Sequence, residues 1–143
     1  MVLRSDEAKA KLVPALKPGN VAKVEADPMT LILAFDLAFF KRFPELFPEN
    51  PNARIIYESN EKLTYDNAFR NGTLQGAWLI MAARSIGLDV GPMSGFDNKI
   101  VDEAFFGGTT LRSNFICNLG YADESKLAGR YPRLAFEEVT RFI

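Results

Sequence analysis

The sequence contains no histidine, and this absence excludes more chemistry than any other feature of its composition. Histidine is the side chain that most often acts as a general base or metal ligand near neutral pH. Without it, neither a Ser-His-Asp triad nor a Cys-His pair can form, and no metal site is expected. If the protein is an enzyme, we therefore expect its reactive group to be a bound cofactor.

Cysteine is almost absent as well. Cys117 is the only one, it lies within an apolar run, and a single cysteine cannot form an intrachain disulfide. This usage fits a reducing compartment. No signal peptide is visible, and the apolar segment from Leu74 to Ile86 is too short and too interrupted to cross a bilayer. We therefore expect a cytoplasmic protein with no membrane association.

The chain also lacks an excess of charge of either sign. Its 17 basic and 18 acidic side chains leave a net charge of −1, and no block of like charge occurs. Neither nucleic acid nor an anionic membrane is thus indicated as a partner. Apolar material is plentiful, because hydrophobic residues make up 48% of the chain and phenylalanine occurs 12 times. We expect residues 1–143 to form a single domain with a sizeable core.

Apolar runs and helix-capping residues predict the order of the elements. The expected strands are 1–4, 29–35 and 111–121, each an apolar run of strand length or the end of one. The expected helices are 5–12, 20–26, 37–43, 64–87 and 98–106, followed by a short terminal element at 135–143. Residues 37–58 are broken by prolines but rich in phenylalanine, which predicts a surface excursion rather than a linker.

The longest expected helix runs from Thr64, as its N-cap, to Gly87, just past its end. Its second half, Leu74 to Met81, is apolar nearly all round. Such a helix has to be covered on every side, either by its own domain or by a partner subunit. In so short a chain, a subunit interface is a serious candidate.

Three places combine polar or glycine residues with a loop or a helix end. Gly-Pro-Met-Ser-Gly at 91–95 is expected between two helices, where a glycine-proline-glycine loop lets backbone approach a ligand. The other two are Asn20 with Lys23, and Arg130 with Arg133. Each also has a plain explanation: an ordinary turn, a helix start with a solvated lysine, and surface arginines. Arginine nonetheless suits phosphate, because its planar guanidinium donates two parallel hydrogen bonds.

Ser94 followed by Gly95 is superficially similar to a hydrolase nucleophile. The spacing is not Gly-x-Ser-x-Gly, and no histidine is present to activate the hydroxyl. A hydrolase is therefore the weakest interpretation of the 91–95 loop.

A series of motifs makes the sequence recognisable over nearly its whole length. Phe-Arg-Asn-Gly-Thr-Leu-Gln-Gly-Ala-Trp begins at Phe69, Gly-Pro-Met-Ser-Gly-Phe-Asp occupies 91–97, and Ser-Asn-Phe-Ile-Cys-Asn-Leu-Gly-Tyr ends at Tyr121. With Pro-Gly-Asn-Val-Ala-Lys at 18–23 and Tyr-Pro-Arg-Leu at 131–134, the chain resembles the FMN-dependent nitroreductase family. Within it, the sequence is most similar to the malonic semialdehyde reductases of pyrimidine degradation.

The resemblance implies an α+β fold with a central, mostly antiparallel sheet flanked by helices and one long core or interface helix. It implies a homodimeric flavoprotein with FMN in a groove made by both subunits and with NADH or NADPH as hydride donor. The implied acceptor is a small aldehyde such as malonic semialdehyde, reduced to 3-hydroxypropionate, or a nitro or quinone compound. The alternative is a non-catalytic, dimerising remnant of the family that no longer holds FMN well.

The resemblance also implies roles for the polar residues. Asn20 and Lys23 would contact the ribityl chain and the pyrimidine edge of the flavin, with the lysine as the cation near N1 and O2. Arg133, together with Arg130, would meet the phosphate.

The 91–95 loop has an implied role of its own. Pro92, Met93, Ser94 and Gly95 would lie along the isoalloxazine ring, with the backbone N–H of Ser94 or Gly95 near N5. Many relatives carry Glu where Ser94 stands, so the implied role of this residue is that of its backbone. No catalytic side chain is identified, since the hydride chemistry would belong to the flavin.

One departure from the family pattern concerns the N-terminus. The family has a helical region before the first strand, with an arginine-containing phosphate motif and a Ser/Asn-rich loop over the flavin. This sequence starts at or inside that first strand, so we interpret it as an N-terminally short form, either truncated or natural. Part of the contacts to the phosphate and the ring edge then has no supplier.

Overall fold

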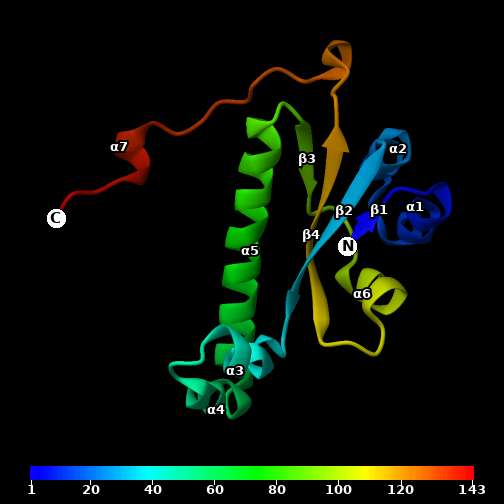
Figure 1. Ribbon diagram of the computed structural model, residues 1–143. Coiled ribbons are helices and arrows are strands. Elements are labelled where there is room, and N and C mark those ends of the chain that lie inside the picture. The colour runs from blue at the N-terminus through cyan, green and yellow to red at the C-terminus, as the bar shows by residue number, and fades with distance from the viewer.

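The computed structural model describes residues 1–143, which form a four-stranded sheet with helices on both faces (Figure 1). The strands are β1 (Val2–Leu3), β2 (Met29–Asp36), β3 (Asp89–Met93) and β4 (Leu111–Gly120). They are ordered β1-β2-β4-β3, and every neighbouring pair is antiparallel. The predicted α+β class with an antiparallel sheet is therefore confirmed.

The helices are short, with one exception. They are α1 (Asp6–Leu12), α2 (Pro18–Ala26), α3 (Phe43–Leu46), α4 (Arg54–Glu58), α5 (Glu61–Ser85), α6 (Asn98–Phe106) and α7 (Phe136–Val139). Single 3₁₀ turns occur at η1 (Val13–Ala15), η2 (Phe39–Arg42), η3 (Pro51–Ala53) and η4 (Glu124–Lys126). Figure 1 shows α1, α2 and α6 beside one face of the sheet and α5 along the other.

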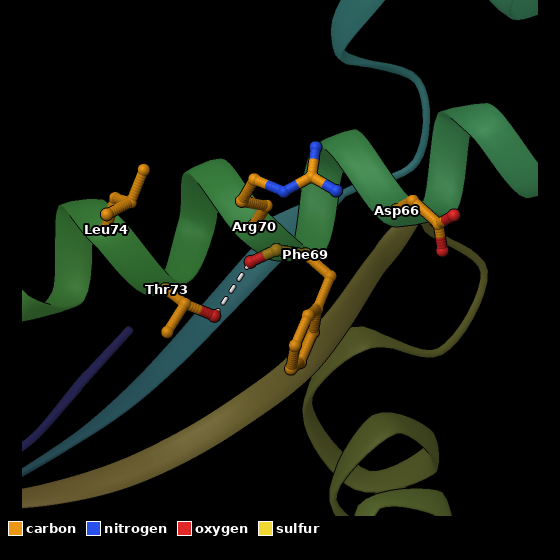
Figure 2. Close-up of a pocket in the computed structure, with 5 residues that line it drawn as sticks. All are labelled: Asp66, Phe69, Arg70, Thr73 and Leu74. Atoms are coloured by element: carbon orange, nitrogen blue, oxygen red, sulfur yellow. Dashed lines mark hydrogen bonds between the residues drawn. The ribbon is translucent and has the colours of Figure 1, made fainter. Parts of the chain in front are cut away.

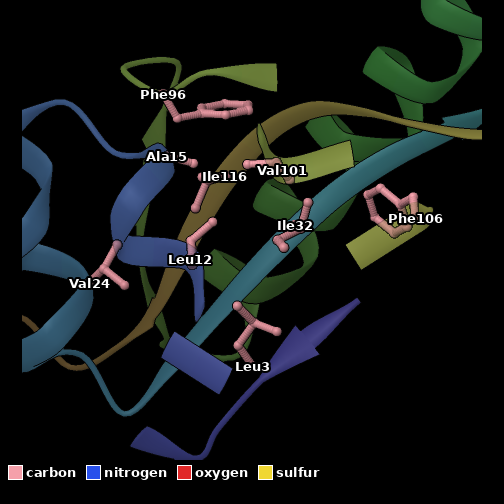
Figure 3. Close-up of a cluster of buried hydrophobic side chains, with 9 residues drawn as sticks. All are labelled: Leu3, Leu12, Ala15, Val24, Ile32, Phe96, Val101, Phe106 and Ile116. Atoms are coloured by element: carbon pink, nitrogen blue, oxygen red, sulfur yellow. The ribbon is translucent and has the colours of Figure 1, made fainter. Parts of the chain in front are cut away.

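The hydrophobic core lies between the sheet and α1, α2 and α6 (Figure 3). Its nine buried members come from both strands and helices: Leu3, Leu12, Ala15, Val24, Ile32, Phe96, Val101, Phe106 and Ile116. Apolar burial of this kind is the main favourable term in folding. Because Val24 of α2 and Phe96 of the loop after β3 belong to the same cluster, the core fixes these two segments relative to each other.

Helix α5 packs across the opposite face of the sheet, and two glycines allow the close approach. A Cβ atom at Gly72 would lie 2.9 Å from Phe35 Cβ, and one at Gly76 would lie 2.6 Å from the Phe115 ring. The outer side of α5 has no such cover: Trp78 is 76% exposed and Met81 is 65% exposed. The predicted all-round apolar helix is thus covered on one side only within a single chain.

We expect Gly72→Ala to destabilise the fold although alanine is the better helix former. Alanine gains up to about 1 kcal/mol in helix propensity. Its methyl group would overlap Phe35 close to that residue's backbone, and overpacking of this kind costs about 1–3 kcal/mol. Gly19→Ala is the matched control, since nothing lies within 4 Å of a Cβ there. Urea unfolding should show a lower midpoint for Gly72→Ala only; a midpoint at or above wild type would contradict the packing.

Several predicted boundaries are wrong. Helix α2 begins at Pro18 rather than Asn20, because proline suits the first turn, where no N–H partner is needed. Helix α5 begins at Glu61 with Asn60 as its N-cap, and Thr64 lies inside it, donating to the Tyr57 carbonyl oxygen at 2.7 Å. Its predicted end is confirmed, because Gly87 has a φ of 86°, a left-handed conformation that favours glycine.

The largest correction concerns residues 91–93, predicted as a loop but forming the second half of β3. This strand pairs only with β4, opposite Gly120 to Ile116, and lies at the edge of the sheet. Proline is tolerated at such an edge because its missing N–H can face away from the ladder. The predicted helix at 37–43 is likewise wrong: a turn, the 3₁₀ turn η2 and the start of α3 occupy this stretch.

The C-terminal segment 123–143 departs from the rest of the molecule. Figure 1 shows it running past α5 and ending far from the sheet. All its hydrogen bonds are local, and the last bond to the body is from Ala122 N to Asp89 Oδ2 at 2.8 Å. Its large apolar side chains are exposed: Leu127, Tyr131, Leu134, Phe136, Val139, Phe142 and Ile143.

Candidate functional site

The structure brings two of the predicted places together, the first turn of α2 and the loop after β3. Asn20 Nδ2 donates to the Gly95 carbonyl oxygen at 3.1 Å, and the Lys17 backbone N–H donates to the same oxygen at 2.9 Å. Leu16 and Phe96 form an isolated antiparallel bridge beside them. Residues 75 positions apart in the sequence are therefore held in direct contact at one site.

Position 95 requires glycine, because a side chain there would clash with Asn20. A Cβ atom there would lie 2.5 Å from Asn20 Nδ2, well inside van der Waals distance. Its φ is not positive, so the requirement comes from space and not from backbone conformation. The group that approaches Gly95 closely in the structure is Asn20 of the same chain, and the predicted approach of a ligand stays a prediction.

Two backbone N–H groups beside this contact have no hydrogen-bond acceptor within the chain. The N–H groups of Ser94 and Gly95 donate to no acceptor, whereas the next N–H, that of Phe96, donates to the Ser94 carbonyl oxygen at 3.0 Å. A pair of adjacent free N–H groups is a suitable donor set for an electronegative ligand atom. The exposed Ser94 side chain has no hydrogen-bond partner either.

Lys23 adds a positive charge to this surface. It follows Asn20 by three residues on α2, so the two side chains project from neighbouring positions on one helix face. Its side chain is exposed and in no ion pair. Pro92 is exposed and Met93 packs partly against the core. Asn20 and Lys23 of α2, together with residues 92–95, make up the candidate site, called the α2–loop surface below. Residues 92–95 are the end of β3 and the first two residues after it, and are called the 92–95 loop for short.

The predicted phosphate arginines are not part of this surface within one chain. Arg130 and Arg133 lie in the C-terminal segment, and both are exposed. Arg133 Nη1 donates to the carbonyl oxygens of its neighbours Tyr131 and Pro132, at 2.8 and 3.1 Å. Since the segment runs away from α2, the role of both arginines stays a prediction.

A buried polar network behind α2 was missed at the sequence level. Asn118 Nδ2 donates to the Lys23 carbonyl oxygen at 2.8 Å and to Asp27 Oδ2 at 2.6 Å, and Thr30 Oγ1 donates to Asn118 Oδ1 at 2.9 Å. Lys9 Nζ lies beside the same helix end. The available signal was an asparagine inside the apolar run at 111–121, since such a residue needs partners when buried.

Two ionisable groups near the network have shifted pKa values. Burial raises the pKa of Asp27, an effect partly offset by the hydrogen bond from Asn118 and by the Lys9 charge. Burial also raises the pKa of the Cys117 thiol. The backbone N–H of Gly91 opposes this shift, because as a donor it favours the thiolate. Because only the thiolate is nucleophilic, Cys117 is poorly suited to covalent chemistry.

Two hollows on α5 lie apart from the predicted residues. Five residues of α5 alone line the first, of 480 Å³: Asp66, Phe69, Arg70, Thr73 and Leu74 (Figure 2). The second, of 610 Å³, lies where α5 meets the end of β2 and the excursion between them, with Phe35, Phe39, Phe43 and Tyr57 in its wall and Asn67, Asn71 and Gln75 as polar lining. No predicted site residue lines either hollow.

No group of three or more cysteine, aspartate or glutamate side chains is arranged to hold a metal ion. No helix has the length and apolar character needed to span a membrane.

Curated proteins with high similarity to this chain share one description. The chain is 53% identical over 138 residues to a "Putative NADH dehydrogenase/NAD(P)H nitroreductase" of Cupriavidus pinatubonensis, covering 95% of this chain and 70% of the relative. It is 56% identical over 138 residues, with the same coverage, to a protein of that description called HadB from Ralstonia pickettii. No protein-family model matches the sequence.

Solved structures with the same fold have much lower identity. The "putative nitroreductase ydfN" of Bacillus subtilis superimposes with a TM-score of 0.88 at 18% identity, covering 100% of this chain and 76% of the other. A "putative nitroreductase in complex with FMN" from Exiguobacterium sibiricum gives a TM-score of 0.87 at 19% identity, covering 100% and 75%. At this identity the likeness establishes the fold alone, and it confirms the expected fold type.

Proposed function

This chain belongs to the family of NADH dehydrogenase/NAD(P)H nitroreductases, and from that premise we propose that it is an FMN-dependent NAD(P)H oxidoreductase. The observation that carries the proposal is 53–56% identity to proteins of that description over 138 residues. A second support is that one structural neighbour is described as a complex with FMN. The absence of histidine agrees with it, because redox chemistry supplied by a flavin needs no imidazole.

The α2–loop surface fits one edge of a flavin. The free N–H groups of Ser94 and Gly95 would donate to the ring, and Asn20, held on the Gly95 carbonyl, would keep the loop in place. Lys23 would place a positive charge at the pyrimidine edge, where it favours the reduced cofactor. The cofactor supplies the hydride transfer, and the protein supplies binding, orientation and charge.

We propose a small aldehyde such as malonic semialdehyde as the natural acceptor, with nitro and quinone compounds also reduced. Support for the aldehyde comes from the Gly-Pro-Met-Ser-Gly-Phe-Asp signature at 91–97, which resembles that of the malonic semialdehyde reductases. Support for nitro compounds comes from the description of the relatives. A cytoplasmic location is part of the proposal, supported by the single, buried cysteine.

We propose that the protein is a homodimer in which a second copy covers the outer side of α5 and the C-terminal segment. The support is the amount of exposed apolar surface, because soluble monomers rarely expose contiguous apolar patches of more than a few hundred Å². On α5 the exposed apolar residues include Leu74, Trp78 and Met81, and a further seven lie in the C-terminal segment. Docking of the C-terminal segment on the second copy would also hold Arg130 and Arg133 in a fixed position, where they would bind the phosphate of FMN.

The test is FMN uptake by the purified protein. We expect flavin absorbance, a higher melting temperature on adding FMN, and NAD(P)H consumption. Lys23→Ala and Arg133→Ala should each weaken FMN binding about 10–100-fold, the range for hydrogen bonds to charged groups. Lys41→Ala and Arg4→Ala are matched controls, because both are exposed and lie outside the α2–loop surface and the C-terminal segment.

One outcome would overturn the enzyme assignment. A colourless wild-type protein that gains no thermal stability from FMN would leave the non-catalytic family remnant as the remaining interpretation.

A further inference from the structure

Helix α2 is fixed at both ends by hydrogen bonds from other elements. At its first turn, Asn20 and Lys17 bind the Gly95 carbonyl oxygen. At its last turn, the Asn118 side chain donates to the Lys23 carbonyl oxygen at 2.8 Å. Lys9 Nζ donates to the carbonyl oxygens of Glu25 at 3.2 Å and Asp27 at 2.9 Å.

These bonds meet a need that every helix end creates. The last four carbonyl groups of a helix have no partner within it, so they bind water or other groups. Here, two buried side chains from β4 and α1 occupy that position, and the charge of Lys9 also suits the negative end of the helix dipole. The end of α2 is therefore tied to the sheet rather than left in solvent.

Asn118 is central to the arrangement. Its side chain is buried, with the residue 4% exposed, and both polar atoms have partners: Nδ2 binds Lys23 and Asp27, and Oδ1 accepts from Thr30. In the sheet it pairs with Thr30 of β2 on one side and Gly91 of β3 on the other. Asn118 thus binds α2 through its side chain and pairs with β3 through its backbone.

The residue whose carbonyl oxygen Asn118 binds is Lys23 itself. Fixing that carbonyl fixes the backbone position from which the lysine side chain extends. Asp27, just past the helix end, receives the second hydrogen bond and completes the link. Through Asn118, strand β4 therefore holds both α2 and the strand that carries Pro92 and Met93.

We propose that Asn118, acting with Asp27, is a positioning residue that sets the place of Lys23 relative to the 92–95 loop. The inference rests on the proposed function, because it takes Lys23 as the cation at the flavin. Because Asn118 is buried, it does not form part of the exposed surface and would not contact a ligand bound there. Its effect would pass through α2.

The test compares Asn118→Leu with a matched change on the same strand. Ser113 is also buried on β4 and also joins the strand to a helix, since Asn98 Nδ2 donates to Ser113 Oγ at 2.9 Å, but that helix is α6. We expect both Asn118→Leu and Ser113→Ala to lower the melting temperature. Only Asn118→Leu should raise the FMN dissociation constant, by about tenfold, the loss expected when the charge-assisted contact of Lys23 is weakened.

Two further readouts separate positioning from general destabilisation. Amides of α2 should exchange faster with solvent in Asn118→Leu, and the reduction potential of bound FMN should become more negative as the Lys23 charge moves. Asp27→Ala, at a half-buried position, removes the carboxylate that helps to hold the Asn118 amide against the Lys23 carbonyl oxygen. It should also raise the FMN dissociation constant, and it serves if Asn118→Leu does not fold.

The outcomes are distinguishable. Wild-type FMN affinity and potential in the Asn118 and Asp27 variants, with wild-type protein binding FMN, would overturn the positioning role alone. An equal loss of FMN affinity in Ser113→Ala would also overturn the positioning role, because the loss would then reflect the lower stability of the fold. A wild-type protein that binds no FMN would overturn the proposed function and this inference with it.

Discussion

Gly95→Ala is expected to release FMN while leaving the fold intact. The added methyl group would lie 2.5 Å from Asn20 Nδ2, so one of the two has to move. The obstructing atom is the end of a flexible amide side chain, which can rotate away with little cost to the backbone. The consequence is loss of the Asn20 bond to the Gly95 carbonyl oxygen, one of the two hydrogen bonds that hold the loop with its free N–H groups in place.

We expect the FMN dissociation constant of Gly95→Ala to rise by about tenfold or more, the loss expected when hydrogen bonds from two N–H donors are weakened. Its free energy of unfolding should stay within about 1 kcal/mol of that of the wild type, because net contributions of single hydrogen bonds are of that size. Fluorescence titration and urea unfolding measure the two quantities on the same samples.

A double-mutant cycle identifies the mechanism. Asn20→Ala removes the obstructed side chain, so Gly95→Ala should cost little more affinity once Asn20 has been shortened. Two residues in contact that act as one unit give such non-additive effects. Additive losses would show that Gly95 and Asn20 act on FMN separately, contrary to the contact in the structure.

Trp78→Glu is expected to dissociate the proposed homodimer. Trp78 lies on the outer side of α5 with 76% of its surface exposed in a single chain, among other apolar residues of the same helix. Tryptophans at interfaces are frequent binding hot spots, whose truncation costs at least about 2 kcal/mol, or a roughly 30-fold weaker complex. A buried carboxylate without a partner adds to that cost.

Sedimentation velocity at micromolar concentration measures the result. Ala10→Glu is the control, because it adds the same charge at an exposed position of α1, across the sheet from α5. The control should stay dimeric, and Trp78→Glu should become a monomer with weaker FMN binding. A monomeric wild-type protein would overturn the proposed homodimer. A fully dimeric Trp78→Glu would show that α5 does not lie in the interface.

The expected site was partly accessible from the sequence because its residues are exposed and belong to short local motifs. The Asn20–Lys23 spacing and the 91–95 stretch depend on a few consecutive residues, and resemblance to known proteins could therefore locate them. Their contact, Asn20 to Gly95, spans 75 positions and follows from the way the core seats α2 beside the loop. No local pattern reports a contact over that distance.

The sequence by itself determined the elements that local chemistry controls: the apolar strands at β2 and β4, the helix at 98–106, the end of α5 at Gly87, and the chemistry that a chain without histidine excludes. Only the tertiary structure decided that residues 91–93 are an edge strand, that one side of α5 is uncovered, and that Asn118 holds α2 from behind. Hydrogen-bond partners and burial come from segments distant in the chain, and they are set when the core packs.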